Sequence, residues 1–168
     1  MSRSRVIAVA LIVAALLLIS SSQAVAATMK FRTVMFHKNA QVIKVSDIEG
    51  HIMAVAELTG LASLDTGEVA VATVSAFADY IKGNGTAQGY IRLSFEDGST
   101  IDYKYLHTTE ALPDGKTSLF KSKSVEITQG SGKYAGIQGE GSFTGKRIAP
   151  FGTGAQLFLD TILTYTLP

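Results

Sequence analysis

The sequence contains no cysteine among its 168 residues, and this absence removes several chemistries at once. Without a thiol, the chain can form no disulfide, no thiolate zinc site and no cysteine nucleophile. An excess of charge of one sign is also lacking, because 15 Lys and Arg stand against 14 Asp and Glu. A formal charge of +1 provides no polybasic surface of the kind that binds nucleic acid. We therefore expect no nucleic-acid partner.

Helical periodicity is lacking after the first 26 residues, where no stretch repeats apolar residues at helical spacing with caps. With 46% hydrophobic residues, the chain is too apolar to be intrinsically disordered. Its length allows one domain, with at most an appendage.

The longest hydrophobic run lies at the N-terminus and predicts a signal peptide. Two arginines precede an uncharged run from Val6 to Ile19, and small residues follow it. This order is typical of secretory signals, with Ala24 and Ala26 forming the A-x-A cleavage site. The run spans 14 residues, whereas a membrane-spanning helix needs roughly 20. We predict cleavage after Ala26, no membrane anchor after cleavage, and a secreted or periplasmic protein.

Removal of residues 1–26 leaves residues 27–168 as one domain that is close to neutral. Because Arg3 and Arg5 are lost, 13 basic side chains remain against 14 acidic ones, a formal charge of −1. Electrostatics then favours neither a membrane surface nor nucleic acid. About 140 residues bury roughly two thirds of their unfolded surface, which is enough for a core without disulfides.

Turn residues recur along residues 27–168 and separate stretches of about 10 to 15 residues rich in β-branched and aromatic side chains. The pattern predicts an all-β fold, a single antiparallel up-and-down barrel of about eight strands preceded by the signal peptide. A lipocalin-like barrel or a β-sandwich stays open as an alternative, because periodicity does not separate closed from open sheets. The strands are expected near residues 30–37, 48–62, 68–82, 86–95, 99–109, 118–128, 138–147 and 156–167.

One hairpin can be placed in register from the sequence. A three-residue loop at Glu96–Gly98 sets Leu93 opposite Ile101 and Arg92 opposite Asp102. This register pairs apolar with apolar side chains and opposite charges with each other, which a two-residue loop does not. Extending the ladder predicts one inner face, with these members: Ile91, Leu93, Phe95, Ile101, Tyr103, Tyr105 and His107.

The preceding hairpin has two readings. A two-residue turn at Asn84-Gly85, the stronger signal, directs the alternate residues from Ala70 to Tyr80 inward and leaves an apolar outer stripe. Such a stripe on a soluble barrel indicates a subunit contact, so we expect a homo-oligomer, a dimer or a trimer. A three-residue loop at 83–85 instead turns Glu57 and Asp79 inward.

The segment Gly130–Gly141, which reads Gly-Ser-Gly-Lys-Tyr-Ala-Gly-Ile-Gln-Gly-Glu-Gly, resembles the G-T-G-K-[FY]-x-x-A-x-G segment of allene oxide cyclase-like and dirigent-like barrels. The resemblance implies an eight-stranded antiparallel barrel with an apolar cavity, often trimeric. Its members cyclise or steer reactive organic intermediates, or have no assigned activity. Dirigent proteins carry Arg where this chain has Gln138, and no catalytic residue of the cyclases is matched here.

Few side chains are arranged for chemistry. The three histidines, His37, His51 and His107, are too far apart in sequence for a local metal site, and we predict no metal and no cofactor. For His37 and His51 we expect structural or surface roles. His107 ends the predicted inner series and can exchange a proton near neutral pH. The predicted ligand-cavity residues are Tyr80, Tyr103, Tyr105 and His107; no catalytic residue is assigned.

Two functions follow from these features. The first is a secreted barrel that binds a small apolar or aromatic molecule in its cavity without catalysis. The alternative is a cyclase- or isomerase-like enzyme of the allene oxide cyclase or dirigent type, acting on a reactive organic intermediate. An enzyme needs a buried, positioned acid or base, whereas a binding protein does not.

Overall fold

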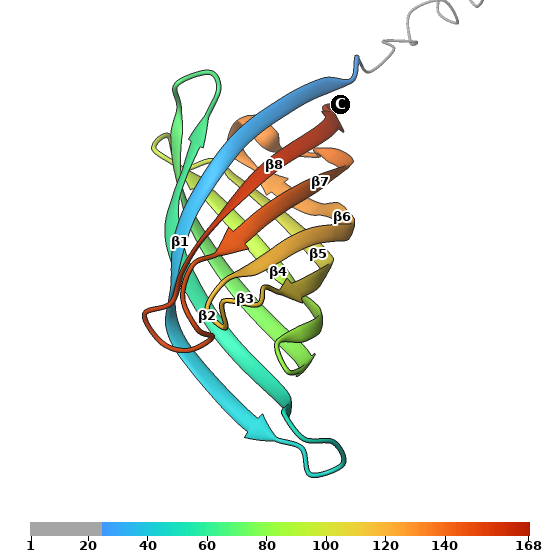
Figure 1. Cartoon of the computed structure of the whole chain (residues 1–168). Coiled ribbons are helices and arrows are strands. Elements are labelled where there is room, and N and C mark those ends of the chain that lie inside the picture. Colours follow the sequence, from blue (N-terminus) through green and yellow to red (C-terminus); the bar gives the residue numbers. More distant parts are fainter. Residues whose placement is uncertain (1–24) are drawn as a thin grey trace, which may run out of the picture.

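The chain folds into a single closed antiparallel β-barrel, seen in a computed structural model that describes residues 25–168 (Figure 1). The strands follow one another around the barrel in sequence order, and β8 pairs with β1 to close it. Their bounds are β1 Ala27–Lys44, β2 His51–Leu64, β3 Val69–Ile81, β4 Asn84–Phe95, β5 Thr100–Ala111, β6 Ser118–Ser131, β7 Gln138–Arg147 and β8 Gln156–Thr166. The predicted all-β barrel of about eight strands is therefore confirmed.

The structure describes only the last two residues of the predicted signal peptide. The proposed signal peptide, residues 1–26, lies almost wholly outside the described residues, and β1 begins at Ala27. Within residues 25–168, no helix has the length and apolar character needed to cross a membrane. A short 3-10 helix, η1 (Gly132–Tyr134), joins β6 to β7.

Alternation of buried and exposed residues along most of their length explains why these segments form barrel strands. In β3, Ala70, Ala72 and Val74 are buried, whereas Val69 and Val71 between them are exposed. A period of two places successive side chains on opposite faces of a sheet. The inward faces of all eight strands meet in the barrel core, which is the hydrophobic interior of the molecule.

The predicted register of the β4–β5 hairpin is confirmed. Leu93 pairs with Ile101, and Arg92 pairs with Asp102. On the outer face, Arg92 Nε and Nη2 donate to the two carboxylate oxygens of Asp102 at 2.7 and 2.9 Å. The loop begins after Phe95, whose N–H donates to the Ser99 carbonyl, so the ladder starts where the sequence placed it.

The predicted turn between β3 and β4 is wrong, although the predicted faces are right. Ile81 pairs with Asn84, so the two-residue turn is Lys82-Gly83 and not Asn84-Gly85. Both turn residues have positive φ, 51° and 81°, as a type I′ turn requires. Asn84 stays in the strand because its side-chain oxygen accepts a hydrogen bond from the Ala111 N–H of β5 at 3.0 Å.

This correction settles which charged groups face inward. The pairing at Lys82-Gly83 has the same parity as the Asn84-Gly85 turn, so Tyr80 remains buried inside. The alternative with a loop at 83–85 is wrong, because Glu57 and Asp79 are both exposed on the outer surface.

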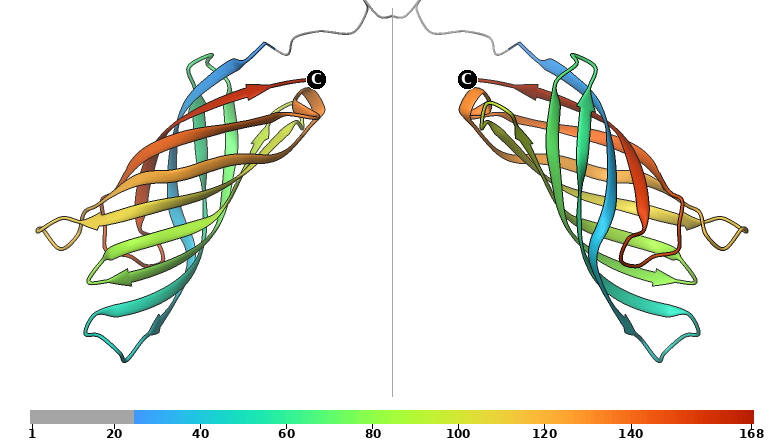
Figure 2. Two further views of the ribbon diagram at one scale, coloured as in Figure 1. Left: turned by 90° about the vertical axis from the view of Figure 1, so that its right-hand side faces the viewer. Right: turned by 90° about the vertical axis from the view of Figure 1, so that its left-hand side faces the viewer.

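The two ends of the barrel are packed differently. At one end, which we call the filled end, η1 and the turns at 65–68 and 96–99 lie near the start of β1 and the C-terminus (Figures 1 and 2). There the ring of Tyr134 packs against Phe95, with centroids 5.0 Å apart. The opposite end, which we call the cavity end, carries the connections 45–50, 82–83, 112–117 and 148–155.

The cavity end is uneven in height. The hairpin of β1 and β2 projects beyond the other strands (Figure 1), since β8 pairs with β1 only as far as Phe36. The β7–β8 loop, residues 148–155, is fixed to β1 at this point. The His37 N–H donates to the Ala155 carbonyl at 3.0 Å, and the Gly154 N–H donates to the His37 carbonyl at 2.7 Å.

Candidate ligand cavity

A cavity of about 50 Å³ lies inside the barrel toward the cavity end. A cavity needs roughly 10–15 Å³ on this measure to hold one water molecule, so there is room for a small group. Its walls are mainly aliphatic and aromatic. The lining residues are Met35, His37, Ala54, Ala56, Leu58, Val74, Ala76, Ala78, Tyr80, Ala87, Ile91, Tyr105, His107, Phe120, Phe143, Arg147, Phe151, Leu157 and Leu159.

Small side chains on three neighbouring strands create this space. Ala54 and Ala56 on β2, Ala76 and Ala78 on β3, and Ala87 on β4 all line the cavity. At the filled end, inward positions of β2 and β3 also carry alanines, Ala62, Ala70 and Ala72, and larger buried side chains from several strands complete the core. These larger side chains include Phe31, Leu64, Phe95, Ile101, Tyr103 and Leu163, all buried.

Opposite the alanines, the wall is an aromatic cluster. The His107 ring lies edge-on to Phe120, with centroids 4.9 Å apart, and 5.6 Å from Phe143. Tyr105 lies edge-on to both His107 and Phe143, at 5.6 and 5.7 Å. Offset and edge-to-face arrangements at such separations are favourable for aromatic pairs, so the cluster forms a firm wall.

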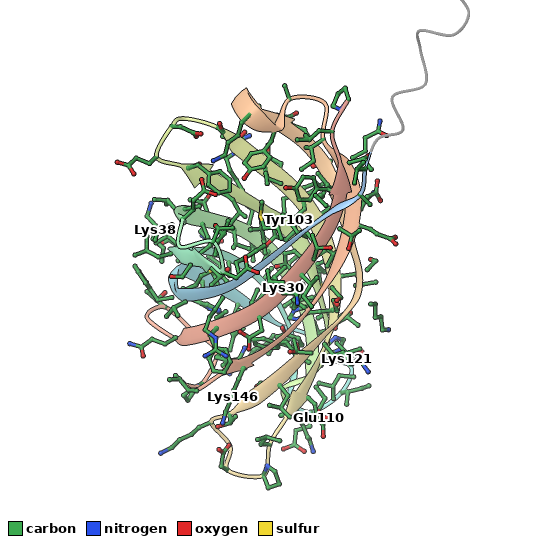
Figure 3. All side chains as sticks on the ribbon, turned by 90° about the horizontal axis from the view of Figure 1, so that it is seen from above. Lys30, Lys38, Tyr103, Glu110, Lys121 and Lys146 are labelled. Atoms are coloured by element: carbon green, nitrogen blue, oxygen red, sulfur yellow. The ribbon has the colours of Figure 1, made fainter. Side chains whose placement is uncertain are left out.

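The four sequence-predicted residues all face the interior, but they do not all reach the cavity. Tyr80, Tyr105 and His107 line it. Tyr103 is fully buried inside the barrel (Figure 3) and is not among the lining residues. Its register partners on the neighbouring strands are Ile91 and Ile127.

The tyrosines that line the cavity are uncharged donors and acceptors. The Tyr80 hydroxyl accepts a hydrogen bond from Thr109 Oγ1 at 3.1 Å. Burial raises the pKa of Tyr80 and of Tyr105, because the phenolate is the form that loses solvation. Both phenols therefore remain protonated at neutral pH.

The cavity residues that were not predicted as site residues include His37, Arg147 and Phe151. His37, for which a structural or surface role was expected, is 3% exposed and lines the cavity. Arg147 and Phe151 line it as well. The signal for His37 was its alternation with Phe31 and Met35, which share the inner face of β1.

Phe151 lies against the cavity residues of other strands. Its ring centroid is 4.8 Å from that of His37 and 6.0 Å from that of Tyr80, in edge-to-face contacts. The Arg147 guanidinium lies 5.3 Å from its centre. Phe151 therefore anchors the β7–β8 loop over the cavity end.

Arg147 is a buried cation at the end of β7. It is 4% exposed. Its Nε donates to the Ala149 carbonyl at 3.0 Å, and its Nη2 donates to Ser118 Oγ at 2.9 Å. The sequence signal for its position was the alternation of β7, since Phe143 and Arg147 share one parity and Lys146 the other.

The uncharged side chains of His37 and His107 line the same cavity as Arg147. The Nδ1 atoms of His37 and His107 are buried and have no hydrogen-bond partner among the described residues. Burial, and secondly the charge of Arg147, lower the pKa of each histidine to about 4. Near pH 7 the cavity therefore contains one permanent positive charge and two uncharged bases.

His51, the third histidine, lies on the outer surface. Its Nδ1 and Nε2 bond to Asp47 Oδ1 and Asp79 Oδ1 at 2.6 and 2.8 Å, which joins the β1–β2 connection to β3. These two hydrogen bonds raise the pKa of His51. Across residues 25–168, no group of three or more His, Asp or Glu side chains is placed to hold a metal ion.

Comparison with known proteins gives distant similarities. No protein-family model matches the chain, and no curated protein matches it. A structure of a protein with unknown function from the DUF3224 family of Shewanella oneidensis MR-1 is similar at 11% identity. It covers 87% of this chain and 99% of that chain, with a TM-score of 0.46.

Two dirigent proteins are also similar. The pterocarpan synthase dirigent protein GePTS1 matches at 8% identity and TM-score 0.44, over 90% of this chain and 94% of that chain. The pterocarpan synthase dirigent protein PsPTS1 matches at 11% identity and TM-score 0.39, over 89% and 99%. At TM-scores below 0.5 these similarities assign this chain neither a family nor a function. The likeness to allene oxide cyclases stays a prediction.

Proposed function

We propose that this protein is an exported barrel that binds a small apolar or aromatic molecule in the cavity without catalysing a reaction. The observation that carries the proposal is the composition of the lining, with alanines on β2, β3 and β4 facing a wall of aromatic rings. Ligand sites are concave, mainly apolar and supplied with a few polar groups, as this cavity is.

The size of the cavity indicates how a ligand fits. At about 50 Å³ it is smaller than the roughly 150 Å³ of an engineered apolar cavity that takes benzene. Phe151 already places a phenyl ring against His37 and Tyr80. A ligand ring therefore takes the place of the Phe151 ring, and the β7–β8 loop moves outward to admit it.

Binding has more support than the cyclase- or isomerase-like alternative. A general base works best with a pKa near the working pH, whereas burial and Arg147 lower the pKa of His107 to about 4. In the described part of the chain, the lining contains no Asp or Glu to orient or activate either histidine. The arrangement suits holding a molecule better than transferring its protons.

The proposal is tested by titrating the protein with toluene and following backbone amide shifts by NMR. We expect shifts at cavity-lining amides, and tighter binding to Phe151→Ala, which removes the ring that fills the site. Ala78→Leu adds side chain inside the cavity and is expected to abolish binding. Val71→Leu, on the outer face of the same strand, is the matched control and leaves binding unchanged.

Absence of shifts in both the wild-type protein and Phe151→Ala would overturn the proposed function. Native mass spectrometry of the protein purified from its source adds an independent measurement. A retained small molecule would identify the ligand class, and its mass would be lost from the Ala78→Leu variant.

A further inference from the structure

Arg147 lacks the acidic partner that a buried arginine normally has. Within residues 25–168, no carboxylate lies within 4.0 Å of its guanidinium, whereas Arg32 and Arg92 on the outer surface each pair with an aspartate. The two bonds that Arg147 donates, to Ala149 and Ser118, end on uncharged oxygens. The Tyr80 side chain, which is uncharged, also interacts with this guanidinium. Buried charges in proteins are normally paired, and within residues 25–168 this cation has no anionic partner.

While the β7–β8 loop is closed, Arg147 is held in place by contacts with that loop and with Ser118 and Phe120 of β6. The bonds from Nε and Nη2 fix the guanidinium plane, and the rings of Phe120 and Phe151 lie 5.9 and 5.3 Å from its carbon Cζ. A guanidinium has five N–H donors, so donors remain beyond these two bonds. Arginine binds carboxylates particularly well, because its planar fork matches their two oxygens.

We propose that the ligand is an aromatic or apolar carboxylate whose charged group pairs with Arg147 while its apolar body lies among the alanines and rings. The inference rests on the proposed function and narrows it to one ligand class. A cavity that carries a net positive charge prefers an anion to a neutral molecule of the same shape. The unpartnered Nδ1 atoms of His37 and His107 supply further polar contacts in the same cavity.

Benzoate and benzamide, which share a ring and a similar shape but differ in charge, test this inference. Isothermal titration of the wild-type protein at pH 7 is expected to show benzoate binding at least about tenfold more tightly than benzamide, because its hydrogen bonds are charge-assisted. In Arg147→Met, this preference is expected to disappear while benzamide still binds.

Lys146→Met is the matched control, since it removes a cation from the neighbouring position of β7, on the opposite face. It is expected to keep the preference for benzoate. A second measurement uses the wild-type protein, in case Arg147→Met does not fold. NMR of the imidazole carbons follows the pKa of His37 and His107. Benzoate is expected to raise this pKa, whereas benzamide is expected to leave it unchanged.

The outcomes separate the two proposals. Equal affinity for benzoate and benzamide, or a preference that survives in Arg147→Met, would overturn the carboxylate inference and leave the binding function standing. Failure of toluene, benzamide and benzoate alike to bind would overturn the binding function, and the inference with it.

Discussion

The three histidines show how the position of a residue in the fold determines the pKa of its side chain. His37, His51 and His107 are the same amino acid, but His51 bonds to two surface carboxylates that raise its pKa. His37 and His107 lie inside the barrel with an arginine, and their pKa is lowered to about 4. The sequence predicted the inward direction of His107 from register, whereas the shared environment with His37 and Arg147 depends on barrel closure.

The buried histidines predict sensitivity to acid. Because their folded-state pKa lies below the unfolded value of about 6.5, the unfolded chain binds protons first as the pH falls. The free energy of unfolding should therefore decrease between pH 6.5 and about 4. For His107 alone the decrease is on the order of 3 kcal/mol over the full window.

Urea denaturation at several pH values measures this effect. His107→Gln should flatten the decrease on the acid side. His51→Gln is the control with the opposite sign, because a raised pKa stabilises the fold at low pH and the contribution is lost as the pH rises above 6.5. A pH profile of His107→Gln identical to that of the wild type would contradict the assignment.

At the scale of the element, local pairing was predictable where two strands carry complementary side chains. The β4–β5 register followed from Arg92 opposite Asp102 and from matched apolar positions. The β3–β4 turn did not, because the Asn-Gly signal at 84–85 is outweighed by a tertiary contact. Asn84 bonds to Ala111, a partner that no analysis of one hairpin could include.

The tight turn leaves Lys82 in a left-handed conformation with φ of 51°, which costs a residue with a Cβ roughly 1–2 kcal/mol. Asparagine tolerates this region better. We expect Lys82→Asn to raise the free energy of unfolding by about 0.5–1 kcal/mol, measured by thermal or urea denaturation. Gly83→Ala is the companion variant and should destabilise, because φ at Gly83 is 81° and an added Cβ would meet Ala111.

A lowered stability of Lys82→Asn would contradict the type I′ assignment at this turn.

A second irregularity lies in β6, where the register against β5 shifts. Lys121 and Lys123 share parity with the apolar Leu119 and Val125, and the register shift opposite Leu106 and His107 resolves the conflict. A bulge of this kind changes which face follows, so Val125 turns inward while both lysines remain exposed.

At the scale of the whole molecule, the outer surface carries an apolar row across four adjacent strands. Phe158, Val34, Leu61 and Val71 are paired in succession from β8 through β1 and β2 to β3. Three of these side chains, those of Val34, Leu61 and Val71, are 47–59% exposed. An apolar stripe on a soluble barrel indicates a protein contact, as the sequence of β3 suggested.

We expect a homo-oligomer to form through this row. Sedimentation velocity should give a mass above that of one chain at micromolar concentration. Leu61→Lys, which places a charge at the centre of the row, should shift the protein to the monomer without unfolding it. Thr108→Lys, on the outer face of β5 away from the row, should leave the association unchanged. A wild-type protein that is monomeric at this concentration would remove the prediction.

The fold class could be predicted from the sequence because it depends on alternation and turn spacing, which are local. Of the cavity, the sequence predicted only some of the inward-facing residues. The alanines of the cavity lie on β2, β3 and β4, and its cation on β7. Their meeting depends on the closure of the barrel through the β1–β8 pairing, a contact between the first and the last strand.

The position of Phe151 has a kinetic consequence. In the proposed binding mode a ligand ring takes the place of the Phe151 ring, which then acts as a competitive inhibitor built into the chain. The apparent dissociation constant then equals the intrinsic one divided by the fraction of molecules whose loop is open. At saturating ligand, the observed association rate should level off at the rate at which the loop opens, and in Phe151→Ala it should keep rising in proportion to ligand concentration.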